Sequence, residues 1–344
     1  MSEPHTPEDR RPRRRIGGPP RPDADRLQVY TAAELFEGFD PSRPESYGET
    51  PDFANYEWFV ATGRNTPMDA VEAVQRAVHD ANVTFDLGGI IAGRRVVGVM
   101  GGHQLPRDSA EYSRIAELAR DLARRGMLVC TGGGPGAMEA AHLGAALSRH
   151  PDTTLGETIT ALAVSPLMPD LHTIVADDGT PDPELVRLAG EWLGPAWLES
   201  LAIENPVETL SIPTWHYGHE PTSPFATHIA KLFQNSIRED GLLTVARQGI
   251  VFTRGSAGTL QEVFQDAQQN FYAKGTDYFS PMVFLGRDYW TQALPVGPLL
   301  DALFATAEPS VREDADRLLL VTDDIVEAAE HLDAFAGGQS RLAR

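Results

Sequence analysis

The 344-residue chain has little lysine and cysteine, and it lacks long apolar runs. Lys231 and Lys274 are its only lysines. No lysine follows a glycine loop, so ATP hydrolysis by a P-loop is not expected, and a pyridoxal phosphate Schiff base has almost no candidates. The single cysteine, Cys130, excludes internal disulfides and a cysteine-based zinc cluster. We expect Cys130 to be a buried small hydrophobe.

Basic residues are also fewer than acidic ones, so the net charge is −20. This charge argues against nucleic acid as the main partner, since phosphate backbones need a basic surface. No apolar run approaches the roughly 20 residues of a membrane span, and the N-terminus has no apolar segment typical of a secretory signal. We expect a cytoplasmic protein with no membrane contact.

Residues 1–28 form an arginine-rich segment with prolines and glycines, and six arginines lie between Arg10 and Arg21. Such a segment cannot bury a core, so the sequence predicts a disordered basic arm. A solvated tail is favoured over an arm that touches RNA or an acidic partner.

Residues 29–92 are predicted to be an N-terminal extension that packs on the main domain and contains one helix. The helix is expected to run from Thr66, as N-cap, through Asn82, with Pro67 at its first position. Its apolar stripe would be Val71, Val74 and Val78.

Residues 93–336 alternate between strand and helix patterns, which is typical of a parallel sheet with crossover helices. The predicted fold class is α/β, a Rossmann-like doubly wound sheet with helices on both faces. The expected strands are 96–100, 127–131, 158–164, 250–252, 282–285 and 318–321. The expected helices are 109–125, a helix ending at 148, 183–203, 224–240, one beginning near Thr259, and a terminal helix capped by Asp323 or Asp324.

Three predicted strands end in small-residue turns, at Gly101-Gly102, Gly132 to Gly136, and Gly255 to Thr259. Ligands of such sheets bind beyond the carboxyl ends of the strands. A glycine turn that leads into a helix presents free N–H groups to an anion, and the helix dipole strengthens the attraction. The turns predict a nucleotide or sugar-phosphate site, with Glu262 one helical turn away. A dinucleotide is not favoured, because the spacing is not G-x-G-x-x-G.

The motifs VGVMGG (97–102), GGGPGAMEAAHLGA (132–145) and GSAGTLQE (255–262) resemble the LOG family over about residues 93–335. LOG proteins are nucleoside 5′-monophosphate phosphoribohydrolases, often mislabelled lysine decarboxylases. The resemblance implies hydrolysis of the N-glycosidic bond of a nucleoside monophosphate, giving free base and ribose 5-phosphate, with no cofactor and no metal. It also implies a homo-oligomer, a dimer or larger, with catalytic groups close to subunit contacts.

The resemblance implies that Glu262 and Arg238 are the catalytic pair. The substrate and phosphate positions that it implies are Gly101, Gly102, Gly133, Gly134, Met138, Arg254, Gly255, Ser256, Gly258 and Thr259. Glu262 would stabilise an oxocarbenium-like transition state and polarise water or a ribose hydroxyl. Arg238 would orient Glu262 and keep it ionised, or contact the sugar phosphate.

The loop Arg254-Gly255-Ser256 departs from the family motif, which has proline and glycine where Arg254 and Ser256 stand, and Gln261 replaces the first of two usual glutamates. Serine restricts the backbone if its position needs a positive φ. Arg254 would either add a phosphate contact or fill the pocket. The alternative function is therefore a non-catalytic nucleotide-binding or sensing protein with the same fold.

Other candidates have plainer interpretations. His103 and Arg107 follow the first strand, where each would either reach the ligand or be a loop residue. His216 and His219 invite a metal interpretation, but without a convincing third ligand a loop with aromatic packing is favoured. Residues 173–222 are predicted to be an insertion that caps the base pocket or builds an oligomer interface.

Overall fold

The structure, a computed structural model, describes residues 26–273 and 279–335. Its centre is a seven-stranded parallel sheet with the order β4-β3-β2-β1-β5-β6-β7. The strands are β1 (Val96–Met100), β2 (Leu128–Thr131), β3 (Leu210–Ser211), β4 (His228–Ile229), β5 (Gly249–Phe252), β6 (Met282–Leu285) and β7 (Leu319–Thr322).

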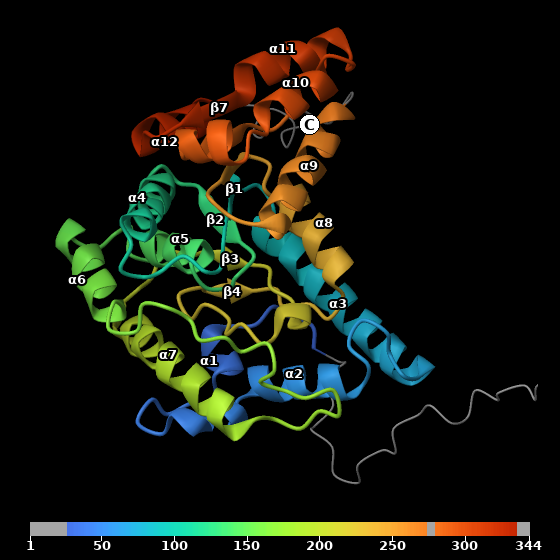
Figure 1. Ribbon diagram of the computed structural model, residues 1–344, viewed down its shortest axis with the longest axis vertical. Helices are drawn as coiled ribbons and strands as arrows, with labels where there is room; N and C mark the ends of the chain where they lie inside the picture. The colour runs from blue at the N-terminus through green and yellow to red at the C-terminus, as the bar shows by residue number, and fades with distance from the viewer. Residues whose placement is uncertain (1–25, 274–278, 336–344) are drawn as a thin grey trace, which may run out of the picture.

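Both faces of the sheet are covered by helices, so the predicted doubly wound α/β fold is confirmed (Figure 1). One face packs on α4 (Ala110–Arg124), α5 (Ala137–Ala146), α6 (Asp152–Leu162) and α12 (Ile325–Ala334). The other packs on α3 (Ala70–Ile91), α8 (Asn235–Val245), α9 (Ala257–Phe271), α10 (Gly297–Phe304) and α11 (Pro309–Leu318). Strand β1 supplies both cores, because successive side chains of a strand point to opposite faces: Val97 and Val99 enter one core, Val96 and Met100 the other.

The region before β1 contains more structure than the single predicted helix. It holds α1 (Ala32–Leu35), the 3₁₀ helix η2 (Pro44–Glu49), α2 (Pro51–Ala61) and α3. Elements α1, η2 and α2 form a third core with α7 (Pro183–Ala202) and the loops around β4. Tyr30 exchanges two backbone hydrogen bonds of 2.8 Å with Ile229 in β4, so the extension closes that edge of the sheet. The basic arm predicted for 1–28 lies almost wholly outside the described residues.

Helix α3 corrects the prediction made for residues 66–82. It begins later, with Asp69 as N-cap accepting from the Glu72 N–H, and it continues to Ile91. The valines predicted to face the core are exposed: Val71 by 61%, Val74 by 60% and Val78 by 42%.

Polar side chains occupy the inner face of α3 because they satisfy buried backbone groups. Arg76 donates to the carbonyl oxygens of Phe59, in the last turn of α2, and of Thr62 and Arg64, just beyond it. Asp80 accepts from the backbone N–H groups that lead into α8. The spacing of apolar residues alone therefore predicted the wrong buried face for α3.

Two further predictions are wrong. Residues 158–164 were expected to form the third strand, but residues 152–162 form α6, since Leu155, Ile159 and Leu162 recur at helical spacing and pack inward. The predicted helix 224–240 contains strand β4, and α8 starts only at Asn235. Strands β3 and β4 have two residues each, too few for a sequence pattern. Strand β3, within the segment 173–222, pairs with β2 in the sheet.

Most other elements agree with the sequence. Strand β6 has the predicted bounds, α7 matches within a residue, and Asp324 caps α12. Cys130 is fully buried, as expected. Among the described helices, none combines the length and apolar character that crossing a membrane requires.

Candidate functional site

The three glycine turns meet where the order of the sheet changes direction. Strand β1 pairs with β2 on one side and with β5 on the other, and the turns follow the carboxyl ends of these three strands. Such a switch point is where open α/β sheets bind ligands. The Gly102 N–H donates to the Arg254 carbonyl at 3.0 Å, and the Ala137 N–H donates to the Gly102 carbonyl at 3.1 Å. The three turns therefore form one continuous rim.

The glycines of the first two turns are required by space and by backbone conformation. A Cβ on Gly101 would lie 2.0 Å from Thr253 Oγ1. Gly133 has φ +78°, and a Cβ there would lie 1.9 Å from Ser211 Oγ. Met138 packs under this middle turn, since its Cε lies 2.8 Å from where a Gly134 Cβ would be. These positions hold the rim tightly against the sheet.

The third turn tolerates its departures from the family motif. Ser256, the N-cap of α9, has φ −121°, so the position does not need a positive φ and serine adds no backbone strain. Residues 256–258 are exposed at the start of α9, whereas Thr259 is buried against Gly255. Arg254 is exposed, with its guanidinium 5.5 Å from the Tyr289 ring centre.

Arg238 and Glu262 lie together beside this rim. Arg238 Nη1 on α8 is 3.9 Å from Glu262 Oε1 on α9, and the side chains are only 10% and 17% exposed. Burial raises the pKa of Glu262 to about 7; Arg238 opposes this rise, and Glu239 adds to it. Arg238 Nη1 also lies 3.9 Å from where a Cβ on Gly132 would be. The pair is thus placed between the last turn and the middle one.

A second buried carboxyl, Glu220, lies on the other side of the middle turn. Its Oε2 is 3.1 Å from where a Gly134 Cβ would be, and its side chain is 12% exposed. Burial raises the pKa of Glu220 to about 7, against lowering by Arg238, His172 and Lys231. The sequence analysis did not single out Glu220. The signal for it was the dense aromatic and histidine run that precedes it, 215–219.

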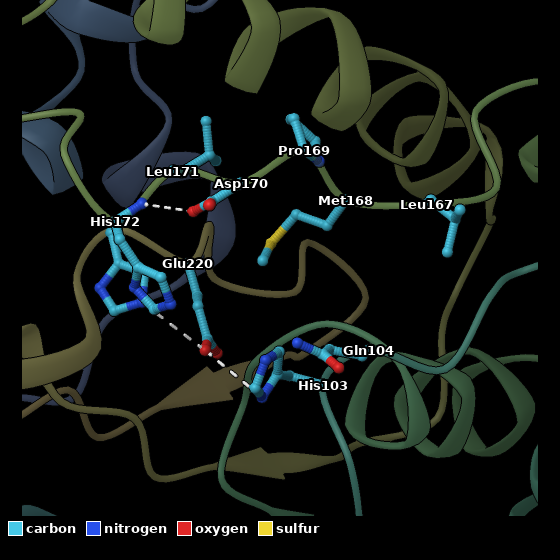
Figure 2. Close-up of a pocket in the computed structure, with 10 residues that line it drawn as sticks. His103, Gln104, Leu167, Met168, Pro169, Asp170, Leu171, His172 and Glu220 are labelled. Carbon is cyan, nitrogen blue, oxygen red and sulfur yellow. Dashed lines mark hydrogen bonds and ion pairs between the residues drawn. The ribbon is translucent and has the colours of Figure 1, made fainter.

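Glu220 borders a cavity of about 360 Å³, shown in Figure 2. His103 Nδ1 lies 3.6 Å from Glu220 Oε1, and His219 Nε2 lies 3.9 Å from the same atom. The rings of His172 and His219 are 4.4 Å apart between centres. The remaining wall is the loop 167–171 together with Gln104. Among the described residues, no group of three or more histidine, cysteine, aspartate and glutamate side chains could hold a metal ion.

Arg107, a second candidate from the first loop, is in the core. Its guanidinium makes two hydrogen bonds of 2.7 and 2.8 Å to the carboxylate of Glu139 and lies 3.9 Å from the Trp192 ring centre. Both members of the ion pair are 1% exposed. Arg107 therefore fixes α5 and α7 to the first loop, and of the two candidates from that loop it is His103 that lines the cavity.

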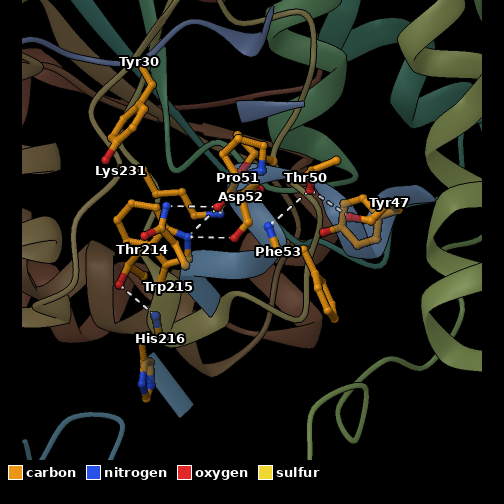
Figure 3. Close-up of polar contacts among 12 residues, drawn as sticks. Tyr30, Tyr47, Thr50, Pro51, Asp52, Phe53, Thr214, Trp215, His216 and Lys231 are labelled. Atoms are coloured by element: carbon orange, nitrogen blue, oxygen red, sulfur yellow. Dashed lines mark hydrogen bonds and ion pairs between the residues drawn. The ribbon is translucent and has the colours of Figure 1, made fainter. Parts of the chain in front are cut away.

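The loop that carries Glu220 is fastened at both ends by Asp52 of the N-terminal extension. Figure 3 shows Asp52 beside Trp215 and Lys231. Trp215 Nε1 donates to Asp52 Oδ1 at 3.1 Å, and Thr222 Oγ1 donates to Asp52 Oδ2 at 3.2 Å. The Lys231 ammonium donates to Asp52 Oδ1 at 2.6 Å and to Thr222 Oγ1 at 2.8 Å. Between these anchors, the Tyr217 ring lies 5.5 Å from the Arg238 guanidinium. The extension thus sets the position of one wall of the site.

Comparison with known proteins finds a match to a family model over part of the chain. No curated protein matches the sequence. The model of the SLOG cluster4 family matches residues 94–150, a segment that runs from β1 to just beyond α5 and includes the first two glycine turns. This part of the chain is therefore similar to the SLOG cluster4 family, a group related to LOG-like Rossmann folds.

Proposed function

We propose that the protein hydrolyses the N-glycosidic bond of a nucleoside 5′-monophosphate, releasing the free base and ribose 5-phosphate. The observation that carries the proposal is the buried Arg238–Glu262 pair beside three converging glycine turns. The match of residues 94–150 to the SLOG cluster4 family supports a nucleotide-related function.

The rim of glycine turns would bind the 5′-phosphate. Residues 255–259 lie at the start of α9. The first backbone N–H groups of a helix have no partners within it and lie at the positive end of the helix dipole. Arg254, also exposed, adds a positive charge at the mouth of the site. Holding the phosphate fixes the ribose relative to the side chains beyond, which converts binding energy into position.

Glu262 would act at the anomeric carbon. Departure of the base leaves positive charge on the ribose, and a carboxylate held in a largely buried site stabilises that charge more strongly than it would in water. Glu262 would also accept a proton from the attacking water. Arg238, 3.9 Å away, favours the ionised form that both tasks need.

Turnover of a nucleotide panel tests the proposal. Purified protein is incubated with AMP, GMP, CMP and UMP, and free base is separated by chromatography and quantified together with ribose 5-phosphate. The proposal predicts equimolar base and ribose 5-phosphate from at least one nucleotide. Binding seen as a thermal shift, with no base released from any of the four, would instead favour the sensing function.

We also propose that the active form is a homo-oligomer and that the boundary of the nucleotide-binding domain lies at residues 93–336. The exposed face of α3 is the region that we assign to contact with a second copy. Val71, Val74, Val78 and Phe85 lie along about 20 Å of that helix, and Phe85 is 87% exposed. A row of large apolar side chains in contact with water is typical of an interaction surface.

A further inference from the structure

Glu220 stands where the rim of the proposed phosphate site meets the 360 Å³ cavity. Its Oε2 lies 3.1 Å from where a Cβ on Gly134 of the middle glycine turn would be. On its other side the carboxylate faces His219 and, as Figure 2 shows, His103. The proposed mechanism does not use this carboxyl. Burial opposes the charged form of a glutamate and so costs free energy. A largely buried glutamate beside a cavity is therefore a candidate for a functional role.

The cavity has the size and the lining of a site for a planar, polar ring. Ligand pockets start at about 300 Å³ and combine apolar walls with a few polar groups. Here Leu167, Met168 and Leu171 supply apolar wall, and the imidazoles of His103 and His172 with Glu220 supply hydrogen-bonding edges. A nucleobase needs this combination, with flat apolar contact on its faces and polar partners at its rim.

We propose that this cavity receives the base and that Glu220 is the general acid that protonates it as it leaves. The inference rests on the proposed glycosidase function and deepens it. A nucleobase anion is a poor leaving group, so a positioned proton donor contributes about 10²–10⁴-fold in rate. Two carboxyls in one site, one protonated and one ionised, are a recurring arrangement in glycoside hydrolysis.

The charges around Glu220 identify it as the proton donor of the cavity. Burial raises its pKa to about 7, so a large fraction is protonated at neutral pH. Burial, with His172 next, lowers the pKa of His219 to about 4, and burial lowers the pKa of His103 as well. A neutral imidazole is a weak acid, so among Glu220, His103 and His219 the Glu220 carboxyl is the group that holds an available proton.

The positive groups that face Glu220 prevent its pKa from rising further. Arg238, His172 and Lys231 each favour the ionised form. Arg238 acts in the same direction on Glu262. One guanidinium therefore influences both carboxyls, and the two titrate near the same pH as parts of one site.

The step balances as follows. The C1′–N bond breaks, its electron pair passes to the base nitrogen, and the Glu220 carboxyl donates a proton to a ring nitrogen of the base. Water adds to C1′ and gives a proton to the Glu262 carboxylate. One nucleotide and one water become one free base and one ribose 5-phosphate, and proton exchange with solvent restores both carboxyls.

The test compares two leaving groups in the Glu220→Gln variant. Hydrolysis of a nucleoside monophosphate needs protonation of the departing base. Hydrolysis of 4-nitrophenyl β-ribofuranoside 5-phosphate does not, because 4-nitrophenolate is a stable leaving group. We expect kcat for the nucleotide to fall about 10²–10⁴-fold and kcat for the nitrophenyl substrate to change by less than about threefold. With the nucleotide as substrate, the alkaline limb of the wild-type pH profile should be absent from the profile of the variant. Glu184→Gln, on the exposed surface of α7, is the matched control and should leave both rates unchanged.

Each outcome has a distinct meaning. Equal loss on both substrates, or no loss on either, in a variant that melts at the wild-type temperature overturns the role of Glu220 and leaves the proposed function standing. A wild-type protein that releases neither base from the nucleotide nor nitrophenolate from the second substrate overturns the function itself. Because glutamine has the shape of a protonated glutamate, the variant should fold; Glu220→Leu gives a second measurement of the same substrate ratio.

Discussion

The guanidinium of Arg238 on α8 lies 3.9 Å from the carboxylate of Glu262 on the neighbouring helix α9. Burial holds the pKa of Glu262 near 7, and Arg238 keeps it from going higher. The arginine therefore raises the ionised fraction of the proposed catalytic carboxylate at neutral pH. Two residues from different elements act here as one unit.

The variant Arg238→Met should lower kcat about 10²–10³-fold, the range seen when one electrostatic contact to a transition state is removed. Glu262 must be ionised to act, so activity rises with pH through its pKa. Without Arg238 that pKa rises, and the acidic limb of kcat/KM against pH should move to higher pH. Arg187→Met, an exposed residue on α7, is the control. An unchanged acidic limb would show that Arg238 does not govern the ionisation of Glu262.

The ion pair between Lys231 and Asp52 should be a main anchor of the N-terminal extension. Both side chains are 2% exposed, and their atoms are 2.6 Å apart. Lys231→Met leaves the Asp52 charge buried without its partner, so we expect a loss of about 3–5 kcal/mol in the free energy of unfolding. The double variant Asp52→Asn with Lys231→Met should lose less. Urea denaturation measures both.

A surface pair provides the comparison for that prediction. Arg64 and Asp177 are 3.3 Å apart, with Asp177 99% exposed. Asp177→Asn should cost no more than about 1 kcal/mol. If Lys231→Met costs as little as Asp177→Asn, the pair does not anchor the extension.

Two glycines of the proposed phosphate site should respond differently to alanine. Gly133→Ala places a Cβ 1.9 Å from Ser211 Oγ at a residue with φ +78°, so it should destabilise the fold by about 1–3 kcal/mol. Gly258→Ala meets no atom within 4 Å and lies in the first turn of α9, so stability should hold or rise slightly. Thermal unfolding of the two variants checks the contrast, and equal melting temperatures would contradict it.

The exposed valines and Phe85 of α3 predict that the protein associates through this face. Phe85→Glu replaces the most exposed apolar side chain of the proposed contact with a charge, so the variant should elute as a smaller species than the wild type in light-scattering chromatography. Glu111→Gln, on α4, is the control for a changed surface charge. A wild-type protein that is monomeric at all concentrations, or a Phe85→Glu variant of unchanged size, would contradict the assignment.

The sequence predicted the parts of the fold that carry strong local patterns. Buried strands such as β5 and β6 are continuous apolar runs, and the turns after β1, β2 and β5 contain glycines that their space requires. Since such turns gather at one edge of a parallel sheet, the location of the candidate site followed from them. The pairing of Arg238 with Glu262 followed instead from the resemblance to the LOG family, and the two side chains lie 3.9 Å apart.

The remaining features depend on tertiary contacts that no local pattern encodes. Helix α3 turns its valines outward because Arg76 and Asp80 bind backbone groups of other segments. Strands β3 and β4 have two residues each and exist through their neighbours in the sheet. Glu220 reaches the candidate site on a loop that is fastened by Asp52, a residue distant in the sequence.

The most direct measurement of the central claim is base release by the Glu262→Gln variant beside the wild type. Its matched control is Gln261→Ala, which changes the exposed neighbouring side chain of α9. With the preferred nucleotide, the wild type and the control should release base and ribose 5-phosphate in equal amounts. Glu262→Gln should bind the nucleotide with similar affinity and release base at least about 10²-fold more slowly. Base release by Glu262→Gln at the wild-type rate would contradict the account.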